Sequence, residues 1–327
     1  MSNDALIKNM DNRICYFDNI KFFLILLVVF GHILQWYTKE IKELAQIFNF
    51  IYSFHMPLFI FMSGLFYSKH NIVSKITSYM YIYILGNAFL ILLNALFKKD
   101  VSVNLLSVPN GYWYVFSLIF LVLLTYLFEN LNKRIVLTMS IITSLLIGFD
   151  NTINGYLSLS RIIVFFPFYY LGHIVDKNRL TELSKNKYIK IISLVVLILT
   201  YYCCYFNKFN YFNFISGQIL GKYGYGSKIA ILKRVLFYIT AIIIGFSYMM
   251  IMPSNSVPVI SKLGKRTINV YFWHFIIIRL LFYLNVNKYA PMYLMLFLSL
   301  PITIILSTRV FEYPVKLISY KNLSSLK

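Results

Sequence analysis

Lys21 and His32 carry the side chains best suited to chemistry, and their spacing places both on one face of a helix. The steps from Lys21 to His32 turn an α-helix by about 1100°, within ~20° of three full turns, and rise about 16 Å. Lysine binds phosphate as a point charge, and a neutral imidazole accepts a proton from a hydroxyl. The pair therefore suits an extended acyl carrier with phosphates at one end, although a lysine that merely flanks a membrane span gives the same spacing.

Further ionisable side chains lie inside or at the end of apolar stretches. They are His55, His274, Arg161, Arg279, Arg309 and Glu312. An ionisable residue at membrane depth is costly and marks a functional site by default. Hydrogen bonding between helices is an equally good explanation for any single histidine. Three histidines at this depth together favour a site.

Three other segments fit either a structural or a functional role. His55-Met56-Pro57 kinks a helix and frees a carbonyl, and Ser63-Gly64 fits a packing notch between helices. Tyr112-Trp113-Tyr114 fits an aromatic belt at the membrane interface, and its rings also suit stacking on a sugar. Arg161 can hold a hydroxyl or carboxylate of an acceptor, but it is also an ordinary charge at the mouth of a span.

The composition predicts that helices crossing a bilayer position these residues. Of the 327 residues, 59% are hydrophobic and 13% are charged, whereas soluble domains carry roughly 45–50% and about 25%. The apolar residues form blocks close to the ~20 residues that a membrane-spanning helix needs. We therefore expect an all-α, polytopic integral membrane protein with a single domain over residues 1–327 and no appended soluble domain.

About ten transmembrane helices are predicted, with both termini in the cytoplasm. The predicted spans are 20–38, 47–66, 76–97, 113–128, 135–149, 159–175, 188–206, 232–252, 267–285 and 291–311. Lys and Arg are more numerous in the loops on the side of the two termini, which is the cytoplasmic side by the positive-inside rule. The loop at 207–231, rich in Gly and Tyr, is a candidate flap over a site that faces outward.

The net charge of +20 is better explained by contact with anionic lipid than by nucleic acid, because no zinc or RNA-binding signature accompanies it. Cys15, Cys203 and Cys204 have neither metal-ligand nor disulfide spacing, so we expect them to serve packing. The lipid bilayer is thus an expected partner, and no metal and no nucleic acid are expected.

Several segments together resemble the acyltransferase family 3, which includes fucose 4-O-acetylase-like and capsule polysaccharide O-acetyltransferases. Lys21 to His32 is similar to the Arg/Lys-X10-His element of that family. The further segments are FHMPLFIFMSG at 54–64, WYVFSLIF at 113–120, RIIVFFPFYYLGHI at 161–174, LGKRTINVYFWHFIIIR at 263–279 and FEYPVKLI at 311–318. They follow one another in the family's order, and the resemblance covers nearly the whole chain.

The resemblance implies a ten-helix enzyme of the cell membrane that moves acetyl from cytoplasmic acetyl-CoA to a carbohydrate acceptor. It implies that His32 is the catalytic base and Lys21 the cation on the CoA side. The family commonly has Arg where this chain has Lys21, so bidentate recognition of phosphate is lost here. Arg13 is near enough in the sequence to compensate for that loss.

The remaining candidate residues are assigned to catalysis, to the carrier or to the acceptor. We expect His55 to assist catalysis, Arg13, Arg266 and His274 to bind acetyl-CoA with Lys21, and Trp113, Tyr114, Arg161 and Glu312 to bind the carbohydrate. The donor for the tetrahedral oxyanion is left open among His55, His274 and Tyr114. A flippase-like transporter of lipid-linked sugars is the alternative function, because transporters also combine many spans with buried charge and broken helices. A polysaccharide polymerase and a receptor are the further alternatives.

Overall fold

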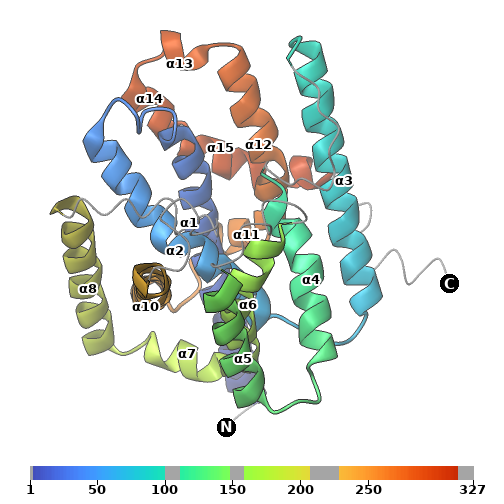
Figure 1. The fold of residues 1–327 in the computed structure, drawn as a ribbon, viewed down its shortest axis with the longest axis vertical. Helices are drawn as coiled ribbons and strands as arrows, with labels where there is room; N and C mark the ends of the chain where they lie inside the picture. Colours follow the sequence, from blue (N-terminus) through green and yellow to red (C-terminus); the bar gives the residue numbers. More distant parts are fainter. Residues whose placement is uncertain (1–2, 100–110, 148–157, 207–227, 316–327) are drawn as a thin grey trace.

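The computed structural model describes residues 3–99, 111–147, 158–206 and 228–315, and this part of the chain is helical without any strand (Figure 1). The prediction of an all-α membrane protein is confirmed. The helices are α1 (Asn3–Leu34), α2 (Lys42–Leu65), α3 (Ile72–Leu96), α4 (Trp113–Leu127), α5 (Lys133–Leu146), α6 (Leu159–Ile174), α7 (Lys177–Leu183), α8 (Lys187–Phe206), α10 (Lys228–Ile251), α11 (Pro258–Gly264), α12 (Thr267–Tyr283), α13 (Val286–Tyr289), α14 (Met292–Phe297), α15 (Ser299–Leu306) and the 3-10 turn η3 (Arg309–Glu312).

Most helices begin and end within a few residues of the predicted spans, and the two ends of the chain differ most. α1 begins at Asn3, well before the predicted start at residue 20. The predicted span 291–311 is divided into α14 and α15. Pro301 accounts for the division, because it has no N–H to donate to the carbonyl of Phe297 and its ring crowds that carbonyl.

Within the described ranges, four helices are long and apolar enough to cross a membrane, namely the Cys15–Leu34 part of α1, α2, α3 and the Arg234–Ile251 part of α10. α7 and α8 form a fifth candidate that bends by 85° between its two parts. α4, α6, α12 and the α14–α15 pair are shorter apolar helices of 10–17 residues.

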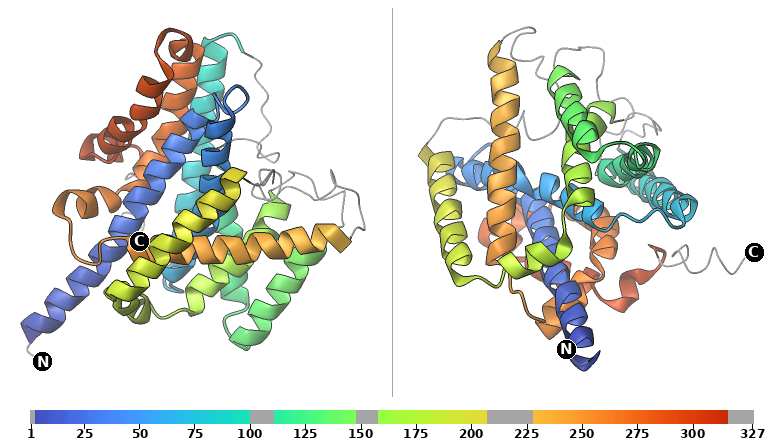
Figure 2. Two further views of the ribbon diagram at one scale, coloured as in Figure 1. Left: turned by 90° about the vertical axis from the view of Figure 1, so that its left-hand side faces the viewer. Right: turned by 90° about the horizontal axis from the view of Figure 1, so that it is seen from below.

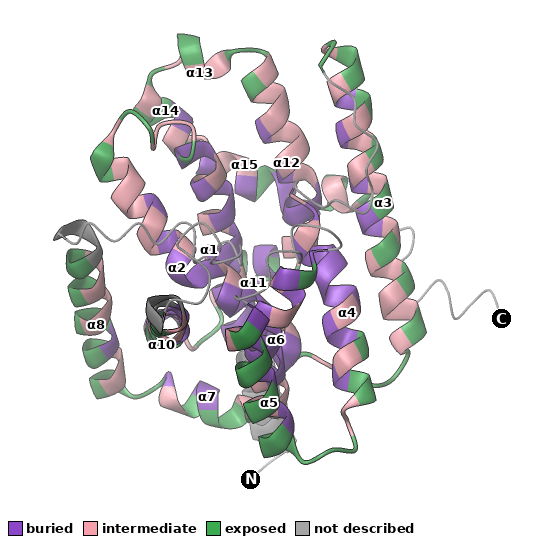
Figure 3. Ribbon diagram, in the orientation of Figure 1, coloured by how far each residue is buried: buried purple, intermediate pink, exposed green. Residues whose placement is uncertain are grey.

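α2 lies at the centre of the bundle, in contact with α1, α6, α8 and α10. Buried residues gather where α1, α2, α4, α6 and α12 meet, and exposed residues mark the outer faces of α3, α5 and α8 (Figure 3). α10 is seen end-on in Figure 1 and lies across the direction of α1 in the left panel of Figure 2. The helices from both ends of the chain thus enclose one interior.

Two glycines allow α2 and α6 to pack backbone to backbone. A Cβ atom at Gly64 would collide with the carbonyl group of Tyr169, and a Cβ atom at Gly172 would collide with the carbonyl group of Phe61. Only glycine permits helices to approach this closely. The packing notch predicted at Ser63-Gly64 is therefore present, with Gly172 as its counterpart on α6.

The candidate flap at 207–231 lies almost wholly outside the described residues, and so does the side chain of Arg13. Cys15 is half-buried and Cys203 is exposed, and both are free thiols. The expected packing role fits Cys15, whose side chain is partly covered by protein, better than Cys203, whose side chain is exposed.

Candidate active site

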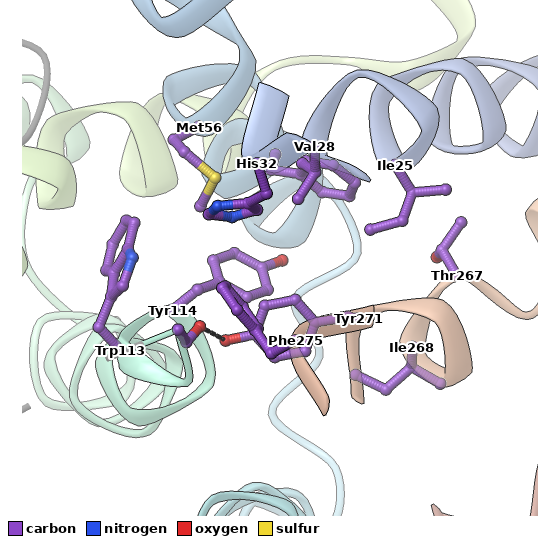
Figure 4. Close-up of a pocket in the computed structure, with 12 residues that line it drawn as sticks. Ile25, Val28, His32, Met56, Trp113, Tyr114, Thr267, Ile268, Tyr271 and Phe275 are labelled. Carbon is purple, nitrogen blue, oxygen red and sulfur yellow. Dashed lines mark hydrogen bonds between the residues drawn. The ribbon is translucent and has the colours of Figure 1, made fainter. Parts of the chain in front are cut away.

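A cavity of about 80 Å³ lies beside α1 in the interior of the bundle (Figure 4). Ile25, Val28 and His32 line it from α1, at the spacing of three and four residues that defines one face of a helix. Lys21 lies one turn before Ile25 on this same face. The alignment of Lys21 with His32 that the sequence predicts is therefore the alignment that the helix has.

The other walls of the cavity come from α2, α4 and α12 and from Gly111, two residues before α4 begins. They consist of Met56, Phe59, Gly111, Trp113, Tyr114, Thr267, Ile268, Tyr271 and Phe275. Most are aromatic or apolar, and a few hydroxyl groups are placed among them, as is usual for ligand sites. Ligand sites typically have roughly 300–1,000 Å³, so two substrates fit here only when lining side chains move apart.

The three predicted histidines come from different helices and gather around one position. The ring of His32 lies 5.5 Å from that of His274 and 4.6 Å from that of Phe275, between ring centroids. Tyr52 connects His32 to His55, with centroid distances of 6.5 and 4.5 Å. His55 and His274 are buried, whereas His32 is half-buried and lines the cavity.

Hydrogen bonds to the helix backbone fix the proton positions of the two buried imidazoles. Nδ1 of His55 lies 2.8 Å from the carbonyl oxygen of Ile51, and Nδ1 of His274 lies 2.9 Å from that of Val270. A carbonyl only accepts, so Nδ1 carries the proton and Nε2 of the neutral ring keeps a lone pair. Nε2 of His274 has no hydrogen-bond partner and is buried. Neither neutral ring has a second N–H to donate to an oxyanion.

The hydroxyl group of Tyr114 is a donor at the cavity wall. The Ser63 hydroxyl donates to the carbonyl oxygen of Phe59 at 2.9 Å, so the Tyr114 O–H donates to Ser63 Oγ at 2.7 Å. A phenol rotates about its C–O bond and can turn its proton toward a bound group. Of the three side chains considered for the oxyanion, Tyr114 is thus the one with a suitable proton.

Two neighbouring tyrosines are held by the backbone instead. The Tyr271 hydroxyl donates to the carbonyl oxygen of Gly111 at 2.8 Å, as drawn in Figure 4. The Tyr112 hydroxyl donates to the carbonyl oxygen of Phe272 at 2.6 Å. These bonds connect the start of α4 to α12 and hold the two helices that carry Tyr114 and His274.

Trp113 and Arg161 form one unit at the cavity edge. The guanidinium carbon of Arg161 lies 4.8 Å from the Trp113 ring centroid, which is a cation–π contact. The Trp113 ring also stacks on the ring of Phe165, with centroids 5.6 Å apart. Trp113 is therefore part of the cavity wall. It is half-buried, so a place in an aromatic belt at the membrane interface is compatible with this position.

Lys21 lies in the middle part of α1, in a cationic cluster three helical turns before His32. Its Nζ lies 2.6 Å from Asp18 Oδ1 and 5.5 Å from the ring centroid of Phe66. Lys177 Nζ lies 4.6 Å from the same ring, which is 41% exposed. Phe66 and Lys177 were not predicted, because a single Phe after a span and a single Lys in a loop carry no signal until the fold brings them to Lys21.

Arg266 and Glu312, predicted to bind different substrates, form an ion pair. The Arg266 Nε donates to Glu312 Oε1 at 2.7 Å, which ties the start of α12 to η3. The structure therefore brings His32, His55, His274, Trp113, Tyr114 and Arg161 to one region, and places Lys21 one turn from the cavity on the face of His32. Arg266 and Glu312 do not line that cavity.

The sequence also did not predict Thr267, Tyr271 and Phe275, which line the cavity from α12. They are one turn apart from each other, a spacing that points to one helix face. The apolar residues of α12 continue around the whole helix, so the pattern does not distinguish the cavity face from the others. Among the described residues, no group of three His, Cys, Asp or Glu side chains is placed to hold a metal ion.

The cavity wall holds an imidazole that can act as a base, an O–H donor and several aromatic rings, and Lys21 lies one turn from the cavity on the face of His32. These groups suit acyl transfer. Neither the curated proteins nor the solved structures include a significant match to the chain. The family model described as an acyltransferase domain matches residues 14–311, which include every described residue of the site. The chain therefore belongs to the acyltransferase family 3 and is a membrane-embedded acyltransferase.

Proposed function

We propose that the protein is an O-acetyltransferase of the plasma membrane that moves acetyl from cytoplasmic acetyl-CoA to a hydroxyl of a cell-surface carbohydrate or its precursor. The observation that carries the proposal is the position of His32, which lines an interior cavity next to His274 and on the face of α1 that bears Lys21. A base inside the bundle and a cation about three turns away on the same face of α1 match an extended thioester carrier.

His32 acts as the general base in this proposal. The acceptor oxygen attacks the thioester carbonyl carbon while the imidazole of His32 takes the hydroxyl proton. The tetrahedral oxyanion accepts a hydrogen bond from Tyr114, the C–S bond then breaks, and the CoA sulfur takes the proton back from His32. The products are the acetyl ester and CoA, and both catalytic groups return to their starting protonation.

His274 positions His32 and supports it when it is charged. Its Nδ1–H is held by the Val270 carbonyl, its Nε2 keeps a lone pair without a hydrogen-bond partner, and its ring lies 5.5 Å from that of His32. A lone pair next to an imidazolium lowers the free energy of the charged form. The proposal therefore gives His274 a place in the catalytic centre, next to the role in acetyl-CoA binding that the sequence led us to expect.

The two ends of the site divide the substrates. Lys21 and Lys177, whose ammonium groups both lie over the exposed Phe66 ring, offer charge to the CoA phosphates. The half-buried ring of Trp113, which Arg161 and Phe165 partly cover, offers apolar contact to the sugar. Arg161 next to it offers N–H donors to the sugar oxygens. The cavity between these ends is the place where thioester and hydroxyl meet.

The test is the acetylation of acceptor by membranes that contain the protein, with labelled acetyl-CoA as donor. His32→Ala should lower the rate about 10²–10⁴-fold, which is the usual contribution of a general base. His70→Ala is the matched control, because His70 is exposed in the loop after α2 and should leave the rate unchanged. Full acetylation of the acceptor by His32→Ala would refute the assignment of the base.

A further inference from the structure

A second hollow, separate from the His32 cavity, lies between α2, α6, α7 and α10. Its volume is about 200 Å³. Only apolar side chains and one glycine line it. Among them are Pro57, Leu58, Leu180, Ile242, Gly245 and Phe246. We call it the α10 groove. Because no polar side chain reaches it, it cannot serve catalysis and it does not hold ordered water.

The α10 groove exists because α10 stands away from α2 at Gly245. A Cβ atom built at Gly245 would meet the Leu58 side chain at 3.7 Å, which is an ordinary van der Waals contact. At Gly64 the same atom would collide with backbone. α2 and α6 are therefore in close contact, whereas the crossing of α10 leaves a volume that the protein itself does not fill.

The α10 groove is open to the surroundings of the bundle. Ile242 and Phe246 line its rim and are 46% and 36% exposed, whereas Pro57 and Leu58 at its floor are buried. A void in a packed interior is unfavourable, and the surroundings of a transmembrane helix are lipid chains. An opening of this kind is filled from the bilayer.

The end of the groove at Leu180 belongs to a basic surface segment. Residues 176–190 contain five cations and two carboxylates, namely Lys177, Arg179, Lys185, Lys187 and Lys190 against Asp176 and Glu182. α7 turns by 85° from α8, so it runs along the membrane surface if α8 crosses the bilayer. Leu180 of α7 points into the groove, and Arg179, Lys185 and Lys187 are exposed. Cations at this level attract anionic headgroups.

We propose that the α10 groove holds one acyl chain of an anionic phospholipid, whose phosphate lies against the exposed cations of segment 176–190. The apolar lining accounts for the chain, and the charge at the end of the groove accounts for the headgroup. This lipid site does not depend on the proposed acetyl transfer, since the α10 groove and the His32 cavity have no lining residue in common. Lys177 is half-buried and is assigned to the CoA end, so the headgroup is assigned to Arg179, Lys185 and Lys187.

The test uses a photoactivatable phosphatidylglycerol with a diazirine on its acyl chain, added to the purified full chain in detergent. After irradiation, mass spectrometry should find the label on α10 near Ile242 and Phe246. Unlabelled phosphatidylglycerol should compete, and phosphatidylcholine should compete much less. Equal competition by the two lipids, or labelling spread evenly over the exposed face of α8, would overturn the proposal.

Variants at Gly245 test the groove itself. Gly245→Leu fills the groove and should abolish labelling there, whereas Gly245→Ala fits at van der Waals distance and should keep it. Ile198→Phe, on the exposed face of α8, adds bulk outside the groove and is the matched control. If Gly245→Leu elutes as a folded protein and is labelled like wild type, the groove does not hold the chain.

Variants at the cations test the headgroup without touching the interior. Arg179→Gln with Lys185→Gln should weaken competition by phosphatidylglycerol about fivefold for each cation removed. Both positions are exposed, so folding should be unaffected. Unchanged competition would show that charge does not select the lipid. Cross-links between groove residues of two copies would show that a second chain fills the groove instead.

Discussion

Lys21 is part of an ion pair as well as of the proposed CoA entrance. A substitution of Lys21 therefore affects both the stability of the protein and the binding of acetyl-CoA, and the two effects have to be measured separately. The Asp18 side chain is only 4% exposed, whereas that of Lys21 is 26% exposed. Asp18 Oδ2 has no hydrogen-bond partner. The carboxylate therefore depends on Lys21 for its charge balance, and removal of the ammonium leaves a buried charge unpaired.

Lys21→Gln should raise the KM for acetyl-CoA roughly tenfold or more, because one charge-assisted contact to phosphate contributes about 1.5–3 kcal/mol. It should also lower the melting temperature through Asp18. The double variant Asp18→Asn with Lys21→Gln removes the unpaired charge, so it should recover stability and keep the high KM. Lys21→Arg should retain both properties. Steady-state kinetics and thermal unfolding in detergent separate the two effects, and an unchanged KM in Lys21→Gln would exclude Lys21 from the CoA site.

Tyr112 and Tyr114 form a matched pair, because both are buried but only Tyr114 has its hydroxyl at the cavity. Tyr114→Phe should lower kcat about 10²–10³-fold, as loss of an oxyanion donor does, with little change in KM. Tyr112→Phe removes the bond to Phe272 and should cost about 1 kcal/mol of stability without a comparable loss of kcat. Equal rates for the two variants would mean that Tyr114 does not stabilise the transition state.

The sequence predicts a site residue when its type is rare in the surrounding stretch of sequence. Histidine within an apolar stretch is such a case, and all three predicted histidines meet in the structure. Tyr271 and Phe275 could not be recognised, because aromatic residues are frequent throughout this chain. The pairing of Arg266 with Glu312 depends on how α12 meets η3, and neither residue carries that information alone.

At the scale of the helices, the length of each apolar run predicted where most helices lie. The places where a helix is interrupted depend on single residues such as proline, which the apolar pattern does not reveal. Spans such as 159–175 are close to α6 (Leu159–Ile174) because polar or turn-forming residues end the apolar run. α7 and α11 each have seven residues, too few for an apolar run to reveal them. The division of the last span at Pro301 follows from a missing N–H, which a count of apolar residues ignores.

The contact between α2 and α6 should be sensitive to single methyl groups. Gly64→Ala or Gly172→Ala places a Cβ against backbone of the partner helix, which cannot move aside like a side chain. Each should destabilise the protein by about 1–3 kcal/mol, the usual cost of overpacking. Gly245→Ala is the matched control, since its Cβ meets only ordinary contact. Thermal unfolding in detergent measures the difference, and equal melting temperatures for the three variants would contradict this packing.

The helical bundle has charged residues at two opposite edges. The proposed reaction requires the edge near Lys21 to face the cytoplasm, because acetyl-CoA is a cytoplasmic donor in this proposal. The N terminus and α7 lie at the lower edge in Figure 1, and α13 lies at the upper edge. Lys69, Lys133, Lys177 and Lys185 belong to turns or helix starts of the lower edge, with Lys21 and Phe66 nearby. The positive-inside rule then predicts that the proposed CoA entrance faces the cytoplasm.

Cysteine accessibility tests this orientation. In a background with Cys15, Cys203 and Cys204 replaced by alanine, a single cysteine at Lys69 or Lys185 should react with a membrane-impermeant maleimide only in inside-out vesicles. A single cysteine at Lys39 or Lys288 should react in intact cells, because these exposed positions lie at the opposite ends of α1 and α12. The reverse pattern would separate the Lys21 cluster from the cytoplasmic pool of acetyl-CoA. In that case His32 would still be a base inside a membrane protein, but the donor would have to reach it from the other edge of the bundle.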